Sequence, residues 1–165
     1  MFSEIYKNKT VLVTGHTGFK GSWLTAWLKL LGANVTGISL DPPTRPSHFE
    51  TALIHEGILD LRVDIRNANA ISESISTIKP DFIFHLAAQP GVRISPHEYS
   101  RYNDSNIVAF TNILEGVLEG EVKNFLYASS SSVYGNCVRK TYSEDESGLN
   151  PISYYGATKL ANEIL

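Results

Sequence analysis

The chain has 165 residues, of which 42% are hydrophobic, so it is long enough to bury a core in one domain. Its 14 basic and 17 acidic residues give a formal net charge of −3, without a basic block that would suggest nucleic-acid binding. No apolar run approaches the ~20 residues that cross a bilayer. With a single cysteine, Cys137, and charges where a secretory signal is apolar, the sequence predicts a cytoplasmic protein with neither nucleic-acid nor membrane partners.

Short apolar runs alternate with helical patterns along the whole chain. This alternation predicts parallel βαβ units in a three-layer, doubly wound α/β domain, with strand order 3-2-1-4-5 and ligands at the carboxyl ends of the strands. Strands are predicted at residues 11–14, 33–40, 58–65, 81–87 and 124–130, and helices near 19–31, 71–78, 107–117 and 154–165.

Three glycines follow the first predicted strand at intervals of three residues. Gly15 permits a sharp turn, Gly18 lets backbone approach a pyrophosphate, and Gly21 lets the next helix pack closely on the sheet. The free N–H groups and the dipole at the start of that helix suit a diphosphate. A glycine motif alone also fits a merely flexible turn. Here it follows a strand and opens an amphipathic helix, so it predicts a dinucleotide site.

Asp41 indicates which dinucleotide binds. It lies twenty residues after Gly21, at the end of the second strand, where a carboxylate accepts hydrogen bonds from the adenosine ribose and repels a 2′-phosphate. This favours NAD. Arg45 and Lys20 could receive that phosphate, which leaves NADP as the alternative.

We expect neither the tryptophans nor the histidines to bind a cofactor or a metal. Trp23 and Trp27 share the helical spacing of Phe19 and Leu30, so we interpret them as core packing rather than cofactor contacts. The five histidines show no metal-ligand spacing and have no cysteine partners, so we expect no metal site.

Tyr155 and Lys159 are four residues apart in a predicted helix, which places them on one face. A phenol has an unperturbed pKa of about 10, and a nearby ammonium would help it act as a base. An exposed structural pair has the same spacing. However, the segment "ASSSSVYG" ends the fifth strand and offers hydroxyls at the predicted cofactor edge.

Together these residues resemble the extended short-chain dehydrogenase/reductases of the NAD-dependent nucleotide-sugar epimerase/dehydratase family, over essentially all 165 residues. The resemblance implies a Rossmann fold, NAD, a nucleotide-diphosphate sugar substrate and a homodimer. It implies the catalytic residues Ser130, Tyr155 and Lys159. It implies cofactor contacts from Gly15, Thr17, Gly18, Phe19, Lys20, Gly21, Asp41, Asp64, Ile65, Leu86, Ala87, Ala88, Gln89, Asn106, Tyr155 and Lys159.

Within that family the two halves of the chain differ. The segments "VTGHTGFKGSWL" and "SLDPPTRPSHFE" are similar to CDP-glucose 4,6-dehydratases, whereas "YASSSSVYG" and "NPISYYGATKLANE" are similar to UDP-glucuronate 4-epimerases. The resemblance implies an acidic pair or Asp-Lys after the catalytic Ser/Thr of a dehydratase, but this chain has Ser131 and Ser132. We therefore expect a 4-epimerase, with a 4,6-dehydratase as the alternative and a non-enzymatic dinucleotide-binding sensor as a third reading.

The resemblance also bears on domain organisation. Members of the family continue beyond the helix of Tyr155 and Lys159 into a C-terminal substrate domain. Residues 1–165 are therefore expected to be the NAD-binding Rossmann domain of a longer enzyme, and inactive alone.

Overall fold

The computed structural model describes residues 4–93, 96–136, 141–145 and 149–165. The chain forms two compact units. The first unit comprises Met1–Ala87 and Thr111–Tyr127, and the second comprises Ala88–Phe110 and Ala128–Leu165.

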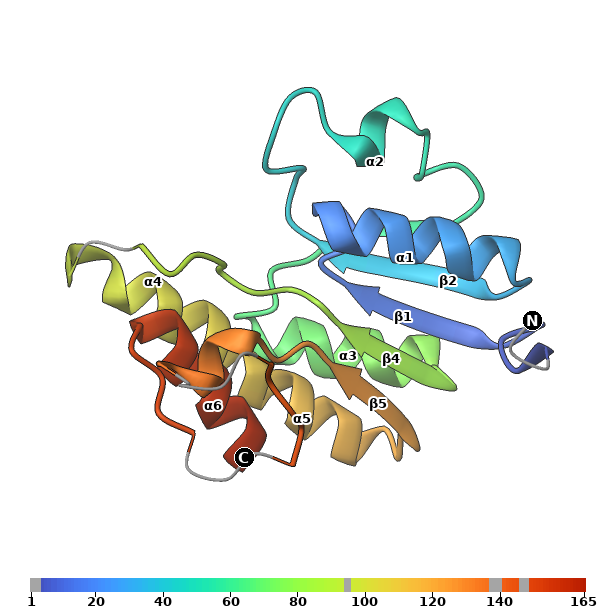
Figure 1. The fold of residues 1–165 in the computed structure, drawn as a ribbon. Helices are drawn as coiled ribbons and strands as arrows, with labels where there is room; N and C mark the ends of the chain where they lie inside the picture. Colours follow the sequence, from blue (N-terminus) through green and yellow to red (C-terminus); the bar gives the residue numbers. More distant parts are fainter. Residues whose placement is uncertain (1–3, 94–95, 137–140, 146–148) are drawn as a thin grey trace. The chain divides into compact units, whose positions relative to one another are not determined.

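The first unit contains a five-stranded parallel sheet of order β3-β2-β1-β4-β5. Figure 1 shows β2, β1, β4 and β5 side by side in this sheet. Each strand coincides with a run predicted from the sequence, and the strand order is the predicted one. The strands are β1 (Thr10–Thr14), β2 (Asn34–Ser39), β3 (Leu59–Arg62), β4 (Phe82–His85) and β5 (Asn124–Tyr127).

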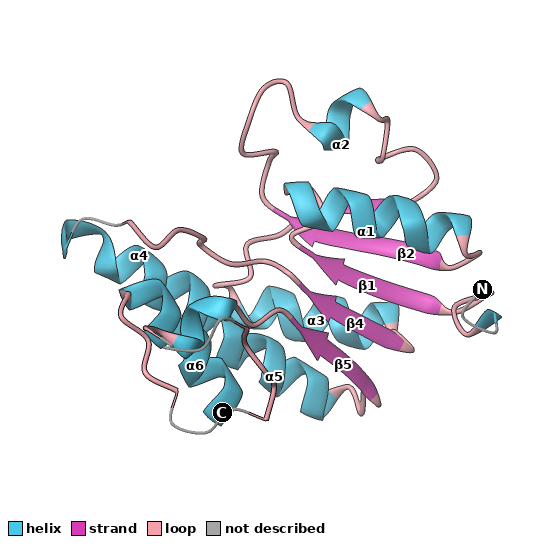
Figure 2. Ribbon diagram, viewed as in Figure 1, coloured by secondary structure: helices cyan, strands magenta, loops and turns pink. Residues whose placement is uncertain are grey.

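Helices cover both faces of this sheet. Figure 2 shows α1 (Phe19–Leu30) on one face, and α3 (Ala68–Ile78) and α5 (Ala109–Glu119) on the other. A short helix not predicted from the sequence, α2 (His48–Thr51), packs against α1. The doubly wound, Rossmann-type arrangement expected from the sequence is confirmed.

The core lies on both faces of the sheet. On one face, Leu28 of α1 packs with Val11, Val13, Val35 and Phe82. In the layer of α3 and α5, Ile71 and Ile75 are fully buried, and Gly116 of α5 lies against Ile75. Burying each such side chain contributes about 1.5–3 kcal/mol to folding, and this core fixes the strand ends that carry the polar motifs.

The interpretation of Trp23 and Trp27 as core packing is wrong. Their side chains are 55% and 46% exposed, and Phe19 and Leu30 on the same stripe are more exposed still. The face of α1 that is buried is made of Gly21, Ser22, Thr25 and Leu28. Small side chains face the sheet because α1 approaches it closely, so the large rings are left on the outer side. Trp23 stacks there on His48, with 4.2 Å between ring centroids.

The second unit is helical. It contains a 3₁₀ turn (Pro96–Glu98), α4 (Tyr99–Asn103), a π-helical turn (Asp104–Val108), a second 3₁₀ turn (Ser131–Tyr134) and α6 (Tyr154–Ile164). The helix predicted near 107–117 thus begins earlier and contains a π turn, which periodicity does not reveal. No helix in the described ranges is both long and apolar enough to cross a membrane.

Candidate functional site

The glycine turn between β1 and α1 is a close-packed backbone crossing. Gly15 has φ +75°, and a Cβ there would lie 2.7 Å from the backbone nitrogen of Ala87. A Cβ at Gly21 would collide with the carbonyl oxygen of Gly15. At Gly18 the space is less restricted, because a Cβ would lie 3.3 Å from the same oxygen. Gly15 and Gly21 are therefore required by packing, whereas Gly18 is not.

Gly18 instead determines what the start of α1 can bind. It is the N-cap of α1 and has no side chain to accept a hydrogen bond from the first turn. In contrast, the N-caps of α2, α3 and α6, which are Ser47, Asn67 and Ser153, each accept one. The N–H groups at the start of α1 carry the positive end of the helix dipole. Their arrangement fits a diphosphate, as the sequence predicts.

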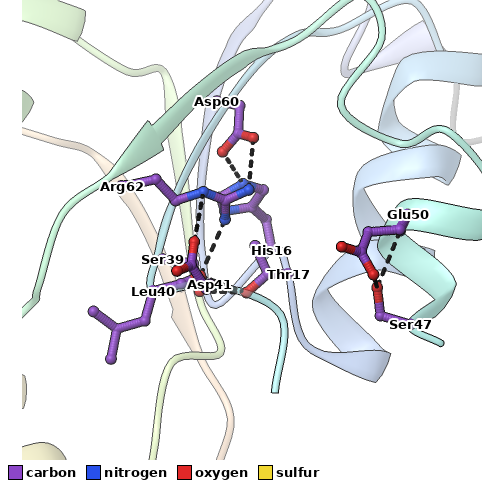
Figure 3. Close-up of polar contacts among 9 residues, drawn as sticks. All are labelled: His16, Thr17, Ser39, Leu40, Asp41, Ser47, Glu50, Asp60 and Arg62. Atoms are coloured by element: carbon purple, nitrogen blue, oxygen red, sulfur yellow. Dashed lines mark hydrogen bonds and ion pairs between the residues drawn. The ribbon is translucent and has the colours of Figure 1, made fainter. Parts of the chain in front are cut away.

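Thr17 connects this turn to the end of β2. Its hydroxyl donates to the carbonyl oxygen of Leu40 (2.9 Å) and lies 2.7 Å from the Ser39 hydroxyl, as Figure 3 shows. The Thr17 side chain is buried, whereas Phe19 and Lys20 are exposed at the start of α1. The turn and Asp41, which follows Leu40, are thereby held at the same edge of the sheet.

A polar network runs from the glycine turn to Asp41 (Figure 3). The fully buried His16 lies 2.8 Å from Asp60 through Nε2, and Asp60 accepts a 2.9 Å bond from the Arg62 guanidinium. Arg62 also donates to the carbonyl oxygen of Leu40 (3.0 Å) and pairs with Asp41 through Nε (3.6 Å).

His16 fits under the turn because β2 has a glycine opposite it. A Cβ at Gly37 would collide with the imidazole ring. Burial lowers the pKa of His16 despite the opposing effect of the Asp60 carboxylate. Because a carboxylate only accepts hydrogen bonds, the proton of the neutral ring is placed on Nε2.

The other cofactor positions predicted in the first unit follow β3 and β4. The Asp64 carboxylate accepts hydrogen bonds from the side chain and the backbone of Arg66, which lower its pKa. The backbone carbonyl of Ile65 accepts a 3.1 Å hydrogen bond from the Asn112 side chain, and the Ile65 side chain is buried. Leu86 and Ala87 continue from β4 beside Gly15, where the N–H of Ala87 donates to the Thr14 hydroxyl.

In the second unit, the buried Asn106 braces two segments that the sequence linked to the cofactor. Its side chain exchanges hydrogen bonds with the backbone of Gln89 (2.7 and 3.1 Å), fixing the segment that begins with Ala88. It also donates to the Thr158 hydroxyl on α6 (3.0 Å). Asn106 lies in the π turn, so the irregular helix supplies the side chain that positions both segments.

The three predicted catalytic residues also lie in the second unit. Lys159 is 4% exposed, its ammonium donates to the carbonyl oxygen of Ala128 (2.9 Å), and burial lowers its pKa to about 8. Tyr155 is half-buried one turn earlier on α6. The Ser130 hydroxyl caps the 3₁₀ turn by accepting from the N–H of Ser132.

Sequence reasoning missed the roles of His16, Gly37, Asp60 and Arg62. The available signal was the pair Asp60 and Arg62, two polar residues on one face of a short strand. Among the residues that the structure describes, no group of side chains could hold a metal ion, and Cys137 lies outside those residues. The roles assigned to individual cofactor and catalytic residues stay predictions.

Comparisons with known proteins agree with this geometry. A model of the NAD dependent epimerase/dehydratase family matches residues 11–165. The chain is 40% identical over 134 residues to CDP-glucose 4,6-dehydratase of Salmonella typhimurium (81% of this chain, 37% of the relative). It is 35% identical over 160 residues to UDP-glucuronate 4-epimerase 3 of Arabidopsis thaliana (93% and 37%).

Solved structures give the same result. MoeE5 in complex with UDP-glucose and NAD is 35% identical, with a TM-score of 0.79 over 94% of this chain and 47% of that one. The chain therefore spans less than half the length of the relatives compared. NAD is the cofactor expected from the sequence, and it is present in this neighbour.

The glycines predict separable effects on stability and on binding. Gly21→Ala should lower the free energy of unfolding by about 1–3 kcal/mol, because its methyl group forces α1 away from the Gly15 carbonyl. Gly18→Ala should change stability by less than ~1 kcal/mol but weaken NAD binding at least tenfold, because the methyl group would narrow the approach to the predicted diphosphate site. Denaturant unfolding and calorimetric titration measure the two effects. Equal losses of stability in both variants would contradict this assignment.

Lys159 predicts a pH dependence of stability. Between pH 8 and 10.5 the unfolded chain keeps a proton on this lysine that the folded chain has released, so the free energy of unfolding should rise with pH. From pH 7 to 10 this contribution is about 2–3 kcal/mol. Subtracting the profile of Lys159→Met, which has no titratable group there, should isolate it. If the difference in unfolding free energy between the protein and Lys159→Met does not change from pH 7 to 10, the ammonium of Lys159 is solvated in the folded protein.

Proposed function

Because the chain belongs to the NAD-dependent epimerase/dehydratase family, we propose that the protein is a nucleotide-sugar 4-epimerase that acts through a transient 4-keto sugar. The observation that carries the choice of epimerase is the pair Ser131 and Ser132 directly after Ser130. The family assignment itself rests on the match over residues 11–165.

Binding of NAD is proposed at the glycine turn. The uncapped start of α1 provides N–H groups for the diphosphate, and Asp41 provides a carboxylate, 89% exposed, for the adenosine ribose. NAD, when bound, supplies the acceptor and donor of a hydride. The chain's own residues must hold the sugar and move its proton.

Proton transfer is assigned to Tyr155. Its phenol, once deprotonated, takes the proton of the sugar 4-hydroxyl, and the Ser130 hydroxyl donates a hydrogen bond to the same sugar oxygen. The ammonium of Lys159, one turn along α6, stabilises the negative charge on the deprotonated phenol. Once the 4-keto sugar has presented its other face, return of the proton from Tyr155 to the C4 oxygen, together with the hydride that bound NAD would give back to C4, yields the C4 epimer with no net oxidation.

Ser131 and Ser132 support epimerisation because neither side chain can carry out the proton transfers that a dehydratase needs. Loss of water across C5 and C6 needs one group to remove the C5 proton and another to protonate the leaving hydroxyl. Serine hydroxyls titrate far too high for either step. In the structure, the Ser132 hydroxyl instead accepts a 3.1 Å bond from Ser130. Epimerisation at C4 requires neither group.

A 4,6-dehydratase is the second candidate, favoured by the 40% identity to the Salmonella enzyme. The segments that resemble such dehydratases are the glycine turn and the stretch after β2, which are proposed to bind the cofactor. The residues proposed to act on the sugar lie after β5 and in α6. The second candidate therefore requires an acid and a base from elsewhere in the protein.

The two tyrosines at the start of α6 provide a matched test of Tyr155. Tyr155→Phe should lower kcat by about 10²–10⁴-fold, because proton transfer is lost. Tyr154→Phe removes only an exposed 2.7 Å bond to Asn103 and should leave kcat within threefold. Steady-state kinetics of the purified protein with its nucleotide sugar compares them. Similar losses in both variants would assign a structural role to the pair.

Solvent isotope distinguishes the two candidate reactions. In D₂O, a 4-epimerase should return product with every carbon-bound hydrogen retained, because the hydride leaves and returns at C4 without exchange. A 4,6-dehydratase must incorporate deuterium while forming a 4-keto-6-deoxy sugar. Proton NMR of the product reads out both. A 4-keto-6-deoxy product with deuterium at C5 would refute the epimerase proposal, because the proton lost from C5 is replaced from solvent, and it would require a search for the missing acid and base.

A further inference from the structure

The side chain beside Asp41 is that of Arg62, and the pairing of β2 with β3 brings the two residues together. β2 and β3 are parallel neighbours, and their register pairs Ser39 with Arg62. Arg62 therefore ends β3 at the edge of the sheet where Asp41 follows β2. Its Nε lies 3.6 Å from the Asp41 carboxylate, as Figure 3 shows.

The Arg62 guanidinium is held from several sides. It donates to the carbonyl oxygen of Leu40 (3.0 Å) and to Asp60 (2.9 Å), and its central carbon lies 5.3 Å from the ring centre of the buried Phe49. Asp60 is fixed in turn by His16. Arg62 is thus preorganised, and its side chain still keeps 38% of its surface exposed.

Asp41 is the loosely held partner of this pair. Its side chain is 89% exposed, and 3.6 Å is longer than a hydrogen bond. An ion pair of this kind contributes little to stability. The Asp41 carboxylate can therefore be replaced or displaced without disturbing the position of Arg62.

We infer that Arg62 is a specificity-determining residue: its guanidinium is a preformed site for a phosphate on the adenosine ribose, and the Asp41 carboxylate masks it. A guanidinium has five N–H donors in a planar fork that matches phosphate oxygens. In this protein Asp41 neutralises that fork and repels a 2′-phosphate, so NAD is selected. A neutral residue at position 41 exposes the site to NADP. This inference rests on the proposed dinucleotide binding at the glycine turn.

The other cation near the end of β2 is less suitable. Arg45 lies in the proline-rich loop and is exposed. Ordering a free arginine on a phosphate costs about 2 kcal/mol of rotamer entropy, which Arg62 has largely lost on folding. Arg45 is therefore the matched control for Arg62.

The test is calorimetric titration of the purified protein with NAD and NADP. Asp41→Asn should tighten NADP binding at least tenfold, or about 1.4 kcal/mol, while weakening NAD binding. Adding Arg62→Gln to Asp41→Asn should abolish the gain, whereas adding Arg45→Gln should preserve it. Arg62→Lys in the same background, which keeps the charge but not the fork, should keep only part of the gain.

Each outcome decides the inference. A gain that survives Arg62→Gln, a gain that is lost with Arg45→Gln, or no gain in Asp41→Asn would overturn it. If Arg62→Gln fails to fold in a thermal melt, Arg62→Lys decides: an undiminished gain in that variant also overturns the inference. Failure of the unsubstituted protein to bind NAD at all would instead reject the proposed dinucleotide site.

Discussion

The close approach of α1 to the turn after β1 is the constraint on which the first unit depends. Gly21 lies against the carbonyl oxygen of Gly15, where only a hydrogen fits. The same face of α1 continues with Ser22 and Thr25 before Leu28 reaches the apolar core. The position of the helix start, and with it the proposed diphosphate site, is therefore set by side-chain size. Hydrophobicity anchors only the far end of the helix.

This constraint explains which parts of the fold could be predicted from the sequence. The runs that became β1 and β4 are apolar enough to identify buried strands, and alternation with helices then implied the parallel order. The orientation of α1 could not be obtained in this way, because hydrophobic periodicity weighs Trp23 and Trp27 heavily and gives no weight to Gly21. A helix packed through small residues presents its large rings outward. Hydrophobic periodicity therefore predicts the wrong buried face for such a helix.

In the candidate site, too, some residues could be predicted from local sequence patterns and others could not. Gly18, Asp41 and the Tyr155–Lys159 spacing are local patterns with a chemical reason, so they were visible in the sequence. The contacts of Arg62 depend on the register between β2 and β3, and His16 meets Asp60 across 44 positions of the chain. No local pattern encodes such distant contacts. The bracing role of Asn106 was hidden for the same reason, since its partners Gln89 and Thr158 lie 17 and 52 positions away.

Two of the cations that the structure fixes, Arg62 and Lys159, lie in opposite environments, and the difference suits their proposed roles. Arg62 keeps carboxylates beside it, so its charge is balanced before any ligand arrives, and it can act only on selectivity. Lys159 is buried and donates to the neutral carbonyl of Ala128, and the lowered pKa shows that its charge is costly in the folded protein. An anion one helical turn away would recover that cost. Because the phenol of Tyr155 must lose its proton before it can act as the proposed base, the buried ammonium of Lys159 would favour the form of Tyr155 that accepts the proton over the protonated form.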